Sequence, residues 1–95
     1  MEKEKKKVLI VIDMQNDFVY GPLGTPEAQA IVPNVVKKVE EYKKDNSIII
    51  STQDTHYANY LETKEGKNLP VNHCIVNSDG WQIEDSVYNS LRRYD

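Results

Sequence analysis

The feature that most constrains this chain is an unbroken run of apolar residues that ends in a carboxylate. Residues Val8 to Ile12 are all aliphatic, and Asp13 follows them directly. A short continuous run of this kind is typical of a strand buried on both faces in a parallel sheet. Ligands of open α/β sheets bind at the carboxyl ends of the strands, where an unpaired carboxylate is costly to bury. Asp13 is therefore either a turn cap or a functional group, and the local pattern leaves both interpretations open.

A second apolar pattern follows with helical spacing. Glycines and prolines between residues 21 and 26 indicate a loop, after which Thr25 is expected as the N-cap and Pro26 as the first helical residue. Pro33 predicts a kink or a restart, because a proline inside a helix removes a hydrogen bond. We expect the helix to end at Asp45-Asn46. Its apolar face consists of Val32, Val35, Val36, Val39 and Tyr42.

A second β-branched run, Ile48 to Thr52, predicts another strand. Strand, helix and strand in this order form a βαβ unit, which implies a parallel pair. Asp54 follows the second strand and is therefore expected at the same edge of the sheet as Asp13. The sequence thus predicts an α/β fold with two acidic residues at one edge.

The rest of the chain has weaker periodicity. We expect residues 57–72 to form a long loop with at most a helical turn near Tyr60–Glu65, and loops of this length are often functional. A short helix is predicted from Ser86 to Arg93, with Asp85 as its cap and Val87 and Leu91 facing inward.

The composition describes one small globular domain. The chain has 95 residues, of which 39% are hydrophobic and 28% are charged. The net charge of -3 offers no basic surplus for a nucleic acid, and no apolar stretch is long enough to span a membrane. A single cysteine, Cys74, excludes an internal disulfide. We therefore expect a cytoplasmic protein in which residues 1–6 form a charged tail.

Asp54 and His56 form a D-x-H motif that could bind a metal. In an extended segment both side chains point the same way, and His73 could complete the set. One aspartate and two histidines suit zinc, iron or manganese. An isolated D-x-H pair also fits an ordinary protein surface, but both histidines of the chain belong to this pattern. Glu62 or Glu65 could add a further ligand.

Four motifs, in this order, resemble a known family. They are V-L-I-V-I-D-M-Q-N-D-F, G-P-L-G-T-P-E-A-Q-A-I-V-P-N-V, S-T-Q-D-T-H and L-P-V-N-H-C. Together they resemble the N-terminal part of the isochorismatase-like cysteine hydrolases, and within these the nicotinamidase-type amidases. The resemblance covers nearly all of residues 7–91. It implies a three-layer α/β/α fold with a parallel sheet, of which residues 7–95 would form the N-terminal portion with only the first βαβ part.

The resemblance also implies roles for individual residues. Asp13 corresponds to the catalytic aspartate that takes the proton from a cysteine nucleophile, and Phe18 to an aromatic residue that lines the substrate pocket. Asp54, His56 and His73 correspond to the metal ligands. The implied reaction cleaves the amide of nicotinamide or a related small amide through a thioester, with release of ammonia.

The family's lysine and nucleophilic cysteine correspond to positions beyond Asp95. The resemblance therefore implies an N-terminal half that is inactive alone, completed by its C-terminal half or by oligomerisation. Two alternatives are a non-catalytic metal-binding or interaction module and a purely structural piece. Cys74 is expected to be a buried, inert thiol. Because one βαβ unit cannot cover both faces of a sheet, we also expect exposed apolar strand residues, Ile48 to Ile50 above all.

Overall fold

The structure is a computed structural model that describes residues 6–92. Its two strands, β1 (Val8–Ile12) and β2 (Ile48–Thr52), are parallel and pair along their whole length. Helix α2 (Pro26–Lys44) connects them. The predicted βαβ unit and the α/β fold class are confirmed.

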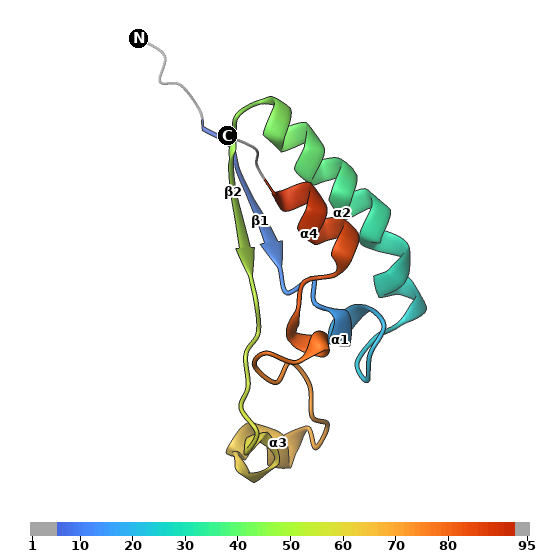
Figure 1. Ribbon diagram of the computed structural model, residues 1–95, viewed down its shortest axis with the longest axis vertical. Helices are drawn as coiled ribbons and strands as arrows, with labels where there is room; N and C mark the ends of the chain where they lie inside the picture. Colours follow the sequence, from blue (N-terminus) through green and yellow to red (C-terminus); the bar gives the residue numbers. More distant parts are fainter. Residues whose placement is uncertain (1–5, 93–95) are drawn as a thin grey trace.

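The other elements lie around the two strands as Figure 1 shows. Helices α2 and α4 lie side by side on one side of the strands, whereas α3 lies far beyond their carboxyl ends. The sequence did not predict α1, and residues 57–72 contain more helix than the single turn that was expected. The remaining elements are α1 (Asn16–Val19), the 3-10 helix η1 (Tyr60–Glu62), α3 (Lys64–Asn68), the 3-10 helix η2 (Asp79–Trp81) and α4 (Asp85–Leu91).

Helix α2 begins as predicted and runs without a break. Oγ1 of Thr25 accepts a hydrogen bond of 3.0 Å from the backbone N–H of Ala28, and Pro26 occupies the first turn. The predicted restart at Pro33 does not occur. Proline removes only one hydrogen bond, and buried valines at 32 and 39 hold the helix to the core on both sides of it.

The core is formed mainly by valines from α2, β1 and α4. The predicted apolar face of α2 is confirmed, because Val32 and Val39 are buried and Val35 and Val36 pack against the core. Burying such a side chain contributes roughly 1.5–3 kcal/mol. The buried cluster consists of Val11, Met14, Val19, Val32, Val39 and Val87.

The two strands are buried on one face only, so the prediction of burial on both faces is wrong. Leu9 and Ile49 pack against the core, whereas Ile10 and Ile50 are 54% and 47% exposed on the opposite face. The physical reason is that α2 and α4 cover the same side of the sheet. The expected exposure of apolar strand residues is thereby confirmed for Ile50 and for Ile48, which is 52% exposed, but not for Ile49.

Helix α4 starts one residue earlier than predicted, at Asp85 instead of Ser86. Its N-cap is Glu84, whose Oε1 accepts a 3.0 Å hydrogen bond from the backbone N–H of Val87, and Asp85 is the first helical residue. The backbone of Glu84 also donates to the carbonyl of Met14, which holds it outside the helix. Val87 is buried and Leu91 packs against the core, as predicted.

The predicted tail lies almost wholly outside the described residues, as does Arg93. In residues 6–92, no helix has both the length and the apolar character needed to cross a bilayer.

Candidate metal site

Asp13 and Asp54 lie beyond the carboxyl ends of β1 and β2, as predicted. Asp13 has a positive φ of 52°, and its N–H donates to the carbonyl and to Oγ1 of Thr52 at 3.2 and 3.1 Å. Oγ1 of Thr52 in turn donates to Oδ1 of Asp13 at 2.6 Å. The carboxylate of Asp13 is thus held at the sheet edge by the neighbouring strand.

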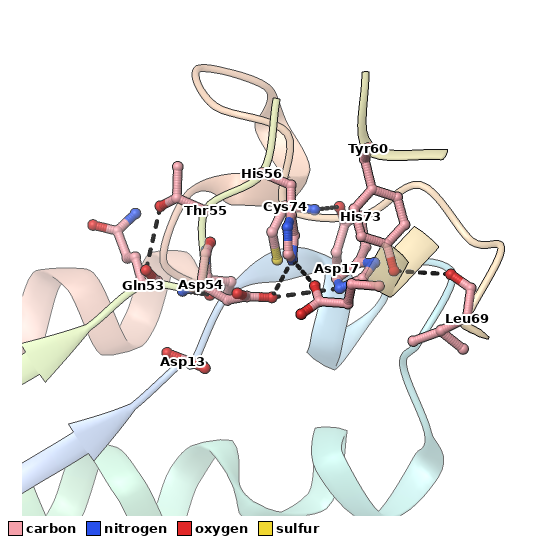
Figure 2. A network of polar contacts seen from close by, with 12 residues as sticks. Asp13, Asp17, Gln53, Asp54, Thr55, His56, Tyr60, Leu69, His73 and Cys74 are labelled. Carbon is pink, nitrogen blue, oxygen red and sulfur yellow. Dashed lines mark hydrogen bonds and ion pairs between the residues drawn. The ribbon is translucent and has the colours of Figure 1, made fainter. Parts of the chain in front are cut away.

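The three predicted metal ligands come together at this edge. The ligand atoms of Asp54, His56 and His73 lie within 4.8 Å of one another. Oδ2 of Asp54 is 2.9 Å from Nε2 of His56 and 3.4 Å from Nε2 of His73. Figure 2 shows the three side chains pointing toward one another.

The chemistry of this cluster fits a cation. Nδ1 of His73 lies 2.7 Å from the carbonyl oxygen of Val71, and only a protonated Nδ1 can donate to it. In the neutral imidazole, Nε2 then presents its lone pair to the carboxylate of Asp54. Two such acceptors repel unless a proton or a cation lies between them. Their spacing suits the latter, since ligands at 2.0–2.2 Å from a tetrahedral zinc lie roughly 3.3–3.6 Å apart.

Of the two glutamates considered as further ligands, Glu65 lies beside the cluster. Its Oε2 is 3.3 Å from Nε2 of His56, although the side chain is 65% exposed. Glu62 forms no ion pair with either histidine in the described part of the chain. The structure therefore favours Glu65 as the additional acidic group.

Aromatic rings enclose the two histidines. The ring of Tyr60 lies 4.6 Å from that of His56 and 5.1 Å from that of His73, and its hydroxyl donates to the carbonyl of Leu69. Burial raises the pKa of Tyr60, and the negative charges of Glu65 and Asp54 raise it further. Tyr60 thus remains a neutral donor. Phe18 meets the ring of His73 edge-on at 5.6 Å.

Backbone pairing holds the histidine segments side by side. The N–H of His56 donates to the carbonyl of Cys74 at 2.9 Å, and the N–H of Val76 donates to the carbonyl of His56 at 2.8 Å. The N–H of Cys74 donates to Oδ2 of Asp17, while Cys74 itself has a positive φ of 50°. This short parallel bridge pairs His56 with Ile75, and the rings of His56 and His73 lie 4.7 Å apart beside it.

Cys74 is buried, as predicted. Burial raises the pKa of its thiol to about 12, and the negative charges of Asp54, Asp17 and Asp13 act in the same direction. A thiol in this environment stays protonated at neutral pH, so it is a poor nucleophile.

Two residues that shape the site were not predicted. Gln15 hydrogen-bonds the backbone of Asp54, and the carboxylate of Asp17 lies so close to Gly80 that a Cβ there would overlap it. No local pattern links Asp17 to Gly80.

Known proteins resemble this chain in sequence and in fold. The Isochorismatase domain model matches residues 7–91. The nicotinamidase of Saccharomyces cerevisiae is 28% identical, and the match covers 90% of this chain and 51% of the yeast protein. A pyrazinamidase of Pyrococcus horikoshii in complex with zinc is 32% identical with a TM-score of 0.73, over 83% of this chain and 45% of its own. A nicotinamidase/pyrazinamidase of Bacillus subtilis is 26% identical with a TM-score of 0.75, and the match covers 87% of this chain and 46% of that protein. This chain therefore spans about half the length of the relatives it matches and belongs to the isochorismatase family.

Proposed function

We propose that this chain is the N-terminal part of a metal-assisted amidase of the nicotinamidase type. Its substrate would be nicotinamide or a related small amide. The observation that carries the proposal is the convergence of Asp54, His56 and His73 at the carboxyl edge of the strands. Similarity to a nicotinamidase and to a zinc-bound pyrazinamidase supports it.

The three ligands would hold one divalent ion, namely zinc, iron or manganese. The two imidazoles and the carboxylate form a donor set suited to these metals. When bound, the ion would act as a Lewis acid that holds the ring nitrogen of the substrate. Tyr60 restricts both imidazole rings, and the carbonyl of Val71 selects the tautomer of His73.

Asp13 is proposed as the catalytic base and Phe18 as a substrate contact. Both side chains line one open pocket, together with Ile12, Met14, Val19 and Ala28. Thr52 fixes Asp13 through Oδ1, while Oδ2 has no hydrogen bond in the described part of the chain. Oδ2 is therefore free to take a proton from a nucleophile above the sheet edge.

The proposed activity also needs a thiolate that these residues do not supply. Cys74 is buried and protonated, so it does not fill this role. Losing the nucleophile of a hydrolase typically lowers the rate on the order of a millionfold. The 95 residues alone are therefore expected to release no measurable ammonia.

Metal content tests the first part of the proposal. The purified chain should bind one equivalent of Zn²⁺ or Co²⁺, and His56→Ala should abolish stoichiometric binding. Asn72→Ala is the matched control, because Asn72 is exposed and adjoins His73 without belonging to the cluster. Equal metal content in the wild type and His56→Ala would contradict the assignment.

An amidase assay tests the second part. The chain is mixed with a separately produced C-terminal half of a family member, and ammonia release from nicotinamide is measured. Activity in the mixture that disappears with Asp13→Ala supports the proposal. Turnover by the chain alone that is lost with Cys74→Ser would overturn it.

A non-catalytic metal-binding module is the second candidate. It is favoured by the same cluster and by the chain's match to only about half of each relative. Metal binding without ammonia release in any mixture would select this candidate.

A further inference from the structure

We propose that Gln15 is a positioning residue that sets the orientation of Asp54 toward the metal. This inference rests on the proposed metal site and adds a residue whose side-chain hydrogen bonds go to backbone groups of Asp54 and Trp81. Gln15 is fully buried and lies between the end of β1 and the segment that follows β2.

The amide of Gln15 pairs with both backbone groups of Asp54. Oε1 of Gln15 accepts from the N–H of Asp54 at 2.9 Å, and Nε2 donates to the carbonyl of Asp54 at 2.8 Å. The second amide proton goes to the carbonyl of Trp81, also at 2.8 Å. Rotating the amide by 180° would place its oxygen against two carbonyl oxygens, so the contacts allow one orientation only.

This pairing takes the place of strand-to-strand hydrogen bonds, which end before Asp54. β1 and β2 pair backbone to backbone as far as Thr52, after which Asp13 turns away with a positive φ. At Asp54, the side chain of Gln15 therefore takes the place of a neighbouring peptide group. The backbone of Asp54 is fixed at both of its polar atoms as a result.

Fixing this backbone matters for the metal because Asp54 contacts both histidines. One oxygen, Oδ2, approaches Nε2 of His56 and Nε2 of His73. A shift of the Asp54 backbone would change both separations together. Groups that orient metal ligands in this way typically change metal affinity 10–100-fold when they are removed.

The test compares two glutamines that share an acceptor. Gln53 also donates to the carbonyl of Trp81, at 3.0 Å, but its side chain has no hydrogen bond to Asp54 in the described residues. Each is replaced by methionine, which has a similar shape and no amide. Zn²⁺ affinity is measured by competition with a chelating dye, and Co²⁺ absorption reports the ligand geometry. We expect Gln15→Met to weaken binding roughly 10–100-fold and to alter the Co²⁺ spectrum, and Gln53→Met to change neither.

The outcomes separate this inference from the proposed function. Equal binding by the wild type and His56→Ala would refute the metal site itself. Wild-type affinity and an unchanged Co²⁺ spectrum in a folded Gln15→Met would overturn only the role of Gln15. If circular dichroism shows that Gln15→Met does not fold, Zn²⁺ affinity and the Co²⁺ spectrum are measured on Gln15→Asn instead. This variant keeps the amide and shortens the reach of the side chain by one methylene. Failure of both variants to fold would assign Gln15 a structural role and overturn the proposal.

Discussion

Oγ1 of Thr52 donates a hydrogen bond of 2.6 Å to Oδ1 of Asp13, which joins the last residue of β2 to the first residue beyond β1. The same hydroxyl accepts from the backbone N–H of Asp13. One threonine side chain therefore holds both the carboxylate and the backbone of the proposed base.

Thr52→Val keeps the shape of this side chain and removes its hydroxyl. A hydrogen bond to a charged group contributes about 1.5–3 kcal/mol, so we expect Thr52→Val to lower the free energy of unfolding by roughly that amount. Urea denaturation measures the change. Thr52→Ser keeps the hydroxyl and should lose less, and equal losses in the two variants would argue against this role of the hydrogen bond.

Glu65 and Glu62 provide a matched pair of carboxylates near the proposed metal site. Of these two glutamates, only Glu65 lies within ion-pair distance of His56 in the described residues, and it is exposed. Glu65→Gln should weaken Zn²⁺ binding by up to about fivefold, because an exposed charge contributes about 1 kcal/mol or less. Glu62→Gln should leave affinity unchanged. Equal effects in a dye-competition titration would exclude Glu65 as an added ligand.

The raised pKa of Cys74 predicts an alkaline loss of stability. The folded thiol ionises near pH 12, whereas an unfolded thiol ionises near about pH 8.5. Between these values the unfolded chain has released a proton that the folded chain retains, so the free energy of unfolding falls as pH rises. Below about pH 8 the thiol is protonated in both the folded and the unfolded chain, so it does not change the free energy of unfolding with pH. Denaturation of Cys74→Ala should show a shallower decline over this range, and parallel curves would refute the assignment.

Thiol reactivity gives an independent measure of the same environment. At pH 8 the folded chain should react slowly with iodoacetamide, because Cys74 is buried and protonated. The guanidinium-unfolded chain should react at the rate of a free cysteine. Fast labelling of the folded chain, followed by mass spectrometry, would show that the thiol is accessible.

The uncovered face of the two strands predicts association. Ile10 and Ile50 lie on this face, and such surfaces pair with other chains. The chain alone should therefore form oligomers in sedimentation velocity. Ile10→Lys with Ile50→Lys should reduce association without unfolding the chain, whereas Leu9→Lys on the packed face should unfold it. A stable monomeric wild type would contradict this prediction.

Elements with local signals could be predicted from the sequence. The strands are short β-branched runs, and α2 has a threonine cap followed by a valine face of helical period. The D-x-H spacing identified Asp54 and His56 for the same reason, because residues two apart in an extended segment share a side. These features depend only on neighbours along the chain.

The remainder depends on distant partners. Gln15 finds its acceptors 39 and 66 residues away, so its own segment contains little information about its role. The cap of α4 shifted to Glu84 because the carbonyl of Met14 accepts from its backbone. Burial of the strands on one face followed from where the helices pack, which an apolar run does not encode.

His56 and His73 stand at the two ends of the segment that carries η1 and α3. An ion bound by both would close residues 57–72 into a ring, as a covalent cross-link would. Ring closure reduces the number of conformations open to the unfolded chain, so part of the ion's stabilising effect would be entropic. Removing the ion would then restore that freedom, and amide hydrogens of η1 and α3 would exchange faster than those of α2 and the strands.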